Sequence, residues 1–170
     1  MTEIRFCAFF HCVVAAALLF VCQSEGEAAV VKKVIRVSAE QSNLLKPDAW
    51  RPWEQGFARE GELIVCDNVG EAEVQRGASQ TIELNQRSPE PIVAAAWSKA
   101  DNVGGAPSSD YALYLDLVYM DGTPLWGQIA SFSVGTHDWQ RREVRVLPQK
   151  PVKSVAVHLL MRNHPGKAWF

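Results

Sequence analysis

Tryptophans with amides and carboxylates nearby are the residues of this sequence best suited to chemistry. The chain has 170 residues and six tryptophans, more indoles than the core of one domain absorbs while each N–H group finds a partner. A flat ring stacks on the apolar side of a sugar, and planar polar groups beside it bind the sugar's hydroxyls. The combination predicts a surface that binds polysaccharide. Our candidate residues are Trp97, Tyr119, Trp126 and Gln128, with Asp116 and Trp53 behind them.

Catalytic motifs are missing from the sequence. It contains no His-Glu-x-x-His, no Gly-x-Ser-x-Gly, no Cys-x-x-Cys and no phosphate-binding loop. Paired carboxylates for glycoside hydrolysis can be drawn from several acids, but their spacing does not show that any two face each other. These acids are Glu54, Glu60, Glu62, Asp67 and Asp116. We therefore predict no catalytic residues and a protein that is not an enzyme.

The candidates centre on a predicted β-hairpin from residue 111 to residue 132. Large apolar residues occupy the odd positions from Tyr111 to Tyr119, which is the pattern of a strand with one buried face. The chain must reverse at 121–124, because this segment contains a glycine and a proline. Beyond the turn, Trp126 and Gln128 share one side of the second strand if that strand has no bulge. Asp116 lies inside the first strand, so we expect it to face a polar groove or to be satisfied by a neighbour such as an arginine.

The rest of the chain also consists of short strand-like segments. They cover residues 62–67, 79–85, 92–99, 139–147 and 152–161. Prolines exclude a regular central strand from residues 46–57. About eight strands at a spacing of roughly ten residues, with no long amphipathic helix, predict an all-β fold, an antiparallel β-sandwich or barrel.

The first residues form a predicted leader. Residues 6–22 are apolar apart from His11, and the small pair Ala28-Ala29 follows a polar segment. This pattern predicts a secretory signal peptide over residues 1–29 and a secreted, periplasmic or extracellular protein, with an uncleaved anchor as the alternative. Residues 30–42 are a spacer or an edge strand, and the β-sandwich domain covers residues 43–170.

The charge of this domain limits the classes of partner that it can bind, and its cysteine content limits its disulfides. The whole chain has 17 basic and 19 acidic residues; the leader carries one basic and three acidic residues, so the domain that follows it is neutral. Neutrality argues against nucleic acid and against an anionic membrane surface as partners. Three of the four cysteines lie in the leader, so Cys66 has no partner within the domain, and we predict an inert buried thiol.

Several spaced segments resemble the jelly-roll carbohydrate-binding modules of the galactose-binding-like superfamily, the type appended to xylanases and cellulases. The segments that carry the resemblance are 43–45 (NLL), 77–80 (GASQ), 111–122, 136–140 (THDWQ) and 166–170 (GKAWF). The resemblance implies a jelly-roll sandwich and a non-catalytic binding module. In that family, Asp residues after the final aromatic strand often hold a structural calcium. This chain stops at Phe170 before such an acid, so the sequence assigns no metal ligands; we expect no cofactor, and structural calcium is the one that the resemblance leaves open.

The last five residues, 166–170, read as a turn and the start of a strand. We expect a truncated or split reading frame whose incomplete strand leaves an open sheet edge for a partner strand; a strand that is simply short is the alternative. The leading functional hypothesis is a secreted module that binds polysaccharide. The alternatives are a structural or protein-interaction domain of the cell envelope and a fragment of a glycoside hydrolase.

Overall fold

The structure is a computed structural model and describes residues 43–170. The predicted signal peptide and the segment 30–42 lie outside the described residues. Within residues 43–170 the structure has ten strands and one short 3₁₀ turn, η1 (Pro47–Ala49). None of its helical segments is long and apolar enough to cross a membrane. The strands are β1 (Arg51–Glu54), β2 (Ala58–Glu60), β3 (Leu63–Asn68), β4 (Gln75–Glu83), β5 (Ile92–Val103), β6 (Tyr111–Tyr119), β7 (Pro124–Ser131), β8 (Gly135–Val146), β9 (Val152–Arg162) and β10 (Gly166–Trp169).

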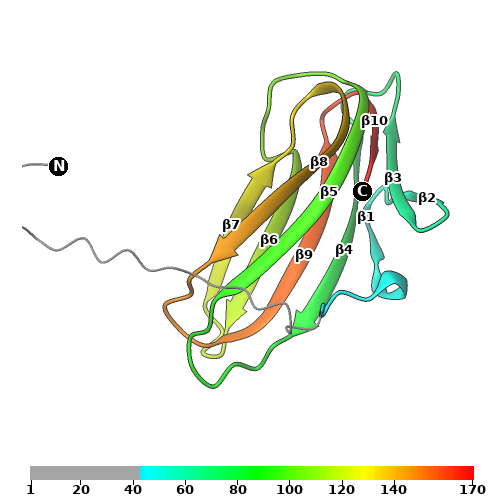
Figure 1. The fold of residues 1–170 in the computed structure, drawn as a ribbon. Helices are drawn as coiled ribbons and strands as arrows, with labels where there is room; N and C mark the ends of the chain where they lie inside the picture. Colours follow the sequence, from blue (N-terminus) through cyan, green and yellow to red (C-terminus); the bar gives the residue numbers. More distant parts are fainter. Residues whose placement is uncertain (1–42) are drawn as a thin grey trace, which may run out of the picture. The chain divides into compact units, whose positions relative to one another are not determined.

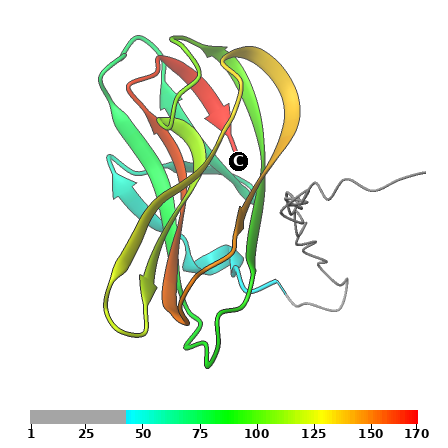
Figure 2. The same cartoon turned by 90° about the vertical axis from the view of Figure 1, so that its left-hand side faces the viewer.

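The strands form two five-stranded sheets that pack face to face (Figures 1 and 2). Sheet A has the order β1-β4-β9-β6-β7 and sheet B the order β2-β3-β10-β5-β8. All neighbouring strands are antiparallel. The predicted antiparallel β-sandwich is confirmed. Each sheet therefore has an inner face toward the core and an outer face toward solvent.

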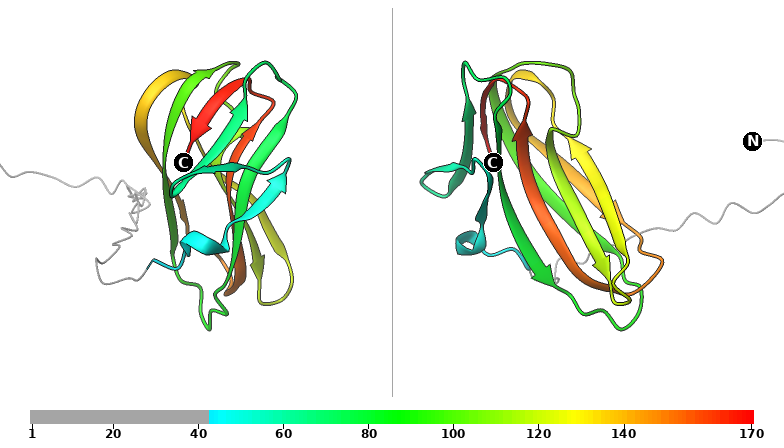
Figure 3. Two further views of the ribbon diagram at one scale, coloured as in Figure 1. Left: turned by 90° about the vertical axis from the view of Figure 1, so that its right-hand side faces the viewer. Right: turned by 180° about the vertical axis from the view of Figure 1, so that it is seen from behind.

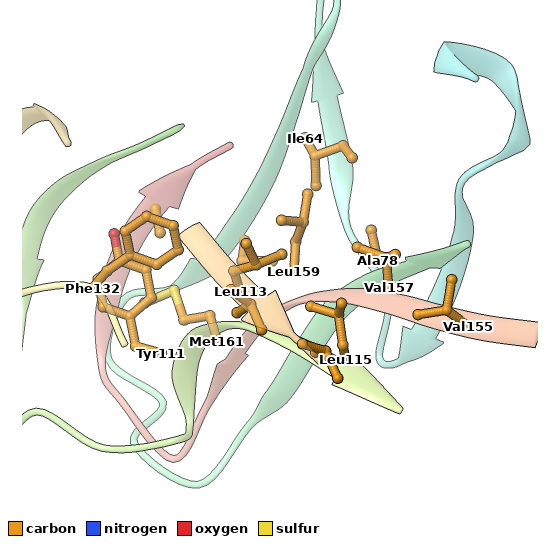
Figure 4. Close-up of a cluster of buried hydrophobic side chains, with 14 of the residues drawn as sticks. Ile64, Ala78, Tyr111, Leu113, Leu115, Phe132, Val155, Val157, Leu159 and Met161 are labelled. Carbon is orange, nitrogen blue, oxygen red and sulfur yellow. The ribbon is translucent and has the colours of Figure 1, made fainter. Parts of the chain in front are cut away.

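The core is built on β6 and β9, which are neighbours inside sheet A. The five odd-numbered residues of β6 are at most 8% exposed, as their alternation predicts. In Figure 4, Leu113 and Leu115 of β6 lie among Val157, Leu159 and Met161 of β9. Each fully buried side chain of this size contributes about 1.5–3 kcal/mol. Because the odd positions face inward, the even positions of β6 face outward.

The predicted hairpin is confirmed as β6 and β7, with the turn at residues 120–123. Gly122 has a φ of +83°, a conformation that glycine adopts without strain. The Asp121 carboxylate accepts hydrogen bonds from the backbone N–H of Thr123 at 3.0 Å and from Lys150 Nζ at 2.7 Å. Pro124 opens β7, which is the edge strand of sheet A and therefore tolerates a residue without an N–H.

The position of β10 corrects one expectation. We expected residues 166–170 to form an incomplete strand at an open edge, but β10 lies inside sheet B between β3 and β5 (Figure 3, left). It pairs with residues 65–68 of β3 and 99–101 of β5. Gly166 permits the close approach, since a Cβ atom there would overlap the backbone carbonyl of Asn102. The described strand is therefore held on both sides.

Candidate functional site

The six candidate residues lie in three separate places. Trp53, Asp116 and Trp126 belong to strands of sheet A and lie on its outer face. Tyr119 and Gln128 line a hollow where the edge strands β7 and β8 approach each other. Trp97 lies on the outer face of sheet B. The hypothesis that these aromatics gather around one hairpin is therefore wrong, because it took no account of which sheet each strand joins.

A bulge in β7 sets the direction of Trp126. The β6–β7 register shifts between Leu115 and Leu117, and Gly127 at the shift has a φ of +70°. As a result, Gln128 pairs with the inward-facing Leu115, whereas the Trp126 side chain points outward and is 59% exposed. The expectation that Trp126 and Gln128 share a side is wrong, because the extra residue of the bulge reverses the alternation between them.

Asp116 fixes this bulge from β6. Its Oδ1 atom accepts a hydrogen bond from the Gly127 N–H at 2.9 Å. Its Oδ2 atom lies 3.9 Å from His158 Nε2. Asp116 is thus satisfied by neighbours, as predicted, but by a backbone amide and a histidine. The carboxylate stays about a quarter exposed, so one oxygen is free to bind a further donor.

His158 lies on β9 in the middle of sheet A, with Ser79 of β4 and Tyr114 of β6 as its register partners. Burial lowers its pKa below the ordinary value and outweighs the Asp116 charge, which raises the pKa; the Arg162 charge lowers it further. Among residues 43–170 its buried Nδ1 atom has no hydrogen-bond partner. At neutral pH the ring is therefore uncharged and presents one donor and one acceptor.

Arg162 joins the aromatic residues of this face. Its guanidinium carbon lies 5.5 Å from the ring centroid of Trp53 and 5.9 Å from that of Tyr114, and one nitrogen pairs with Asp110 at 2.7 Å. The Tyr114 ring meets His158 edge-on at 5.9 Å. Burial, followed by the charge of Asp116, raises the pKa of the Tyr114 hydroxyl, which keeps it a hydrogen-bond donor at neutral pH.

These residues form a continuous set on the outer face of sheet A, which we call the sheet A strip. It consists of Trp53, Tyr114, Asp116, Trp126, His158 and Arg162. The initial candidate list missed Tyr114, His158 and Arg162. The alternation of β6 held a signal for Tyr114, since it shares the even positions with Asp116. His158 and Arg162 come from β9, the third strand after β6, and only the fold reveals that these two strands pair.

The hollow beside β7 does not expose its aromatic residue. It measures about 530 Å³ and is lined by Tyr119, Leu125, Gln128, Arg145 and Lys150, among others. Tyr119 is 8% exposed, and Lys150 Nζ lies 5.6 Å from its ring centroid. Gln128 donates a hydrogen bond to the Trp126 carbonyl at 3.0 Å. Tyr119 thus packs in the core and offers no stacking face, contrary to its assignment as a candidate.

No set of three His, Cys, Asp or Glu side chains within residues 43–170 is arranged to hold a metal ion. Structural calcium stays the one cofactor that the resemblance leaves open.

Comparisons with known proteins give likenesses of structure and none of sequence. No protein-family model and no curated protein match the sequence. Among solved structures the chain is similar to one described as "Family 16 Carbohydrate Binding Module-2", with a TM-score of 0.44 and 12% sequence identity over 71% of this chain and 79% of that chain. A likeness at this level assigns no family, so the functional argument comes from the residues of the sheet A strip.

Proposed function

We propose that residues 43–170 form a non-catalytic carbohydrate-binding module and that a neutral polysaccharide binds to the sheet A strip. The observation that carries the proposal is the outward Trp126 indole, 59% exposed, beside the hydrogen-bonding groups of Asp116 and His158. The Asp116–Gly127 hydrogen bond fixes the bulge and with it the direction in which the Trp126 side chain leaves the strand. Because the backbone is already ordered, binding of a sugar to the indole has to order only the side chain.

The polar groups of the strip match the hydroxyls of a sugar. The Asp116 carboxylate accepts hydrogen bonds, the Tyr114 hydroxyl donates or accepts them, and the neutral imidazole of His158 does both. Arg162 is already paired with Asp110, and Asp116 lies beside His158. Because Asp110 neutralises Arg162, the strip offers no unpaired cation to an anionic sugar, and we infer an uncharged ligand.

The proposal includes export of the protein from the cytoplasm. The predicted signal peptide at residues 1–29 would place the module outside the cytoplasm, where it meets extracellular polysaccharide. N-terminal sequencing of the mature protein tests this part, and we expect cleavage after Ala29. A mature chain that keeps residues 1–29 would contradict it.

Affinity electrophoresis and calorimetry against a panel of neutral plant and algal polysaccharides test the binding proposal. We expect Trp126→Ala to weaken binding at least about tenfold, because a central tryptophan at an interface commonly contributes 2 kcal/mol or more. Asp116→Asn keeps an acceptor for the Gly127 N–H but loses the negative charge, so we expect a smaller, several-fold loss.

Met120→Ala is the matched control. Met120 is 50% exposed but follows β6, outside the strip, so its removal should leave the affinity unchanged. Binding to none of the polysaccharides, or equal binding by wild type and Trp126→Ala, would sink the proposal.

Size-exclusion chromatography of residues 43–170 separates this function from the alternative of a protein-interaction domain. A binding module for glycans is expected to elute as a monomer. A stable oligomer or a co-purifying chain would favour the interaction domain instead.

A further inference from the structure

Three of the six tryptophans lie together on the outer face of sheet B, away from the sheet A strip. Trp169 of β10, Trp97 of β5 and Trp139 of β8 come from three neighbouring strands. Each precedes or follows an inward residue, Ala168, Ser98 and Gln140 respectively, so the three indoles face outward. Trp97 is 55% exposed and Trp139 is 40% exposed. Adjacent strands are about 4.8 Å apart, so the three residues span about 10 Å across the sheet.

The tryptophans leave ring surface available for a ligand. Within residues 43–170, neither Trp97 nor Trp139 packs against another aromatic ring or a cation. Trp169 is held more firmly, because its Nε1 donates to Glu60 at 2.8 Å and Lys167 Nζ lies 4.8 Å from its ring centroid. We call Trp97, Trp139 and Trp169, with the cations between them, the sheet B platform.

Cations lie between these rings. Lys99 is the register partner of Trp169, and the bulge in β8 that contains Trp139 lies on its other side. Arg141 is the register partner of Trp97. Glu143 forms ion pairs with both Arg141 and Arg145. Lys99 belongs to none of the ion pairs among the described residues.

Two carboxylates near the platform already accept hydrogen bonds. Glu60 binds Lys167 and Trp169, and Asp101 accepts a hydrogen bond from Asn102 Nδ2 at 2.9 Å. Lys99 therefore stays outside the ion pairs of the described residues, and Arg141 shares the single negative charge of Glu143 with Arg145. A charge-assisted hydrogen bond from Lys99 or Arg141 favours an anionic group on the ligand.

We propose that the sheet B platform is a second polysaccharide site, specific for a chain whose sugars carry carboxylates. The indoles of Trp97 and Trp139 take the apolar side of the sugar rings, while Lys99 and Arg141 bind the carboxylates. This site does not depend on the sheet A strip. Because the two lie on opposite faces of the sandwich, one domain binds a neutral chain and an acidic chain at once.

Affinity electrophoresis in gels that contain polygalacturonate tests the platform. The matched ligand is the same polymer with its carboxyl groups methyl-esterified, which keeps the rings and removes the charge. We expect polygalacturonate to retard the wild type at least about tenfold more strongly than the ester, with binding that weakens as salt rises. Trp97→Ala and Trp139→Ala should each lose at least about tenfold in affinity. Lys99→Ala should lose several-fold, and Lys99→Arg should restore binding.

Two control variants separate this site from the sheet A strip. Trp126→Ala should keep full binding to polygalacturonate, and Lys153→Ala, which removes one exposed lysine of sheet A, should keep it as well. Equal retardation by the acid and the ester, or undiminished binding by a folded Trp97→Ala variant, would overturn the proposal. Loss of binding in Trp126→Ala would place acidic sugars on the sheet A strip and would equally overturn it.

Discussion

His158 is a residue on which two neighbouring charges act in opposite directions. Asp116 on β6 favours the protonated ring, while burial and Arg162 on its own strand favour the neutral one. Tyr114 faces it from β6, and the register partner on β4 is Ser79, which does not titrate. Because burial dominates, folding lowers the pKa of His158, and the unfolded chain binds the proton more tightly than the folded one.

The consequence is a loss of stability in mild acid. The unfolded pKa of a histidine is about 6.5, so the stability associated with neutral His158 is complete well above that pH and falls as the pH drops through the folded pKa. Between pH 8 and pH 5, we expect the melting temperature of His158→Gln to fall by less than that of the wild type. Glu60 and Glu143 have pKa values below their ordinary ones and act at lower pH. If the melting temperatures of the two proteins change with pH in the same way, His158 is not the source of the loss of stability.

A buried hydroxyl pair makes a second prediction at the residue scale. Ser98 Oγ donates to the Trp169 carbonyl at 2.9 Å and meets the Tyr111 hydroxyl at 2.6 Å. Ser98→Ala would leave both groups buried without this partner, at a cost of about 2–3 kcal/mol in unfolding free energy. Urea denaturation measures the change. Ser79→Ala, on the outer face of sheet A, is the control and should stay within about 0.5 kcal/mol of wild type.

Among the elements, β10 depends on a single glycine for its central place in sheet B. Gly166 has a φ of +108°, and a Cβ atom there would overlap backbone atoms of Asn102 and Val103. Neither obstacle is a flexible side-chain end, so neither can move aside cheaply. The close approach of β10 to β5 is therefore incompatible with any side chain at position 166.

We expect Gly166→Ala to destabilise the domain by more than about 3 kcal/mol, because backbone strain and overlap add together. Gly122→Ala is the comparison: Gly122 has a φ of +83° and open space around it, so only the strain of about 1–2 kcal/mol applies. Thermal denaturation of both variants decides the matter. Equal losses in the two would show that the overlap at β10 is relieved.

Taken as a whole, the sandwich is stabilised by its packed core. The reactivity of the Cys66 thiol measures whether that core is closed. Cys66 is fully buried, and burial raises the pKa of its thiol to about 12. Both effects make the thiolate, the reactive form, scarce in the folded protein.

Labelling of Cys66 by a thiol reagent is therefore expected to follow global unfolding. Peptide-level mass spectrometry, which separates Cys66 from the other cysteines of the chain, should detect slow labelling in buffer and complete labelling in denaturant. The label on Cys66 should rise with urea at the midpoint seen by fluorescence. Rapid modification under native conditions would mean that β3 opens locally.

The sequence alone determined the central hairpin of this protein. Alternation across 111–119 identified the buried face of β6, because a pleated strand places every second side chain on the same side. The glycine and proline near residue 122 identified the turn, because they restrict the backbone locally. These features depend on residues a few positions apart, and both were predicted correctly.

Only the tertiary structure decided which candidates share a surface. Trp97 and Trp126 lie on opposite sheets, and His158 meets Asp116 through the pairing of β6 with β9. The bulge at Gly127 turned Trp126 away from Gln128. Strand order and register depend on contacts between residues that are distant in the chain, and one inserted residue reverses every side chain beyond it. The periodicity of a single strand contains neither fact.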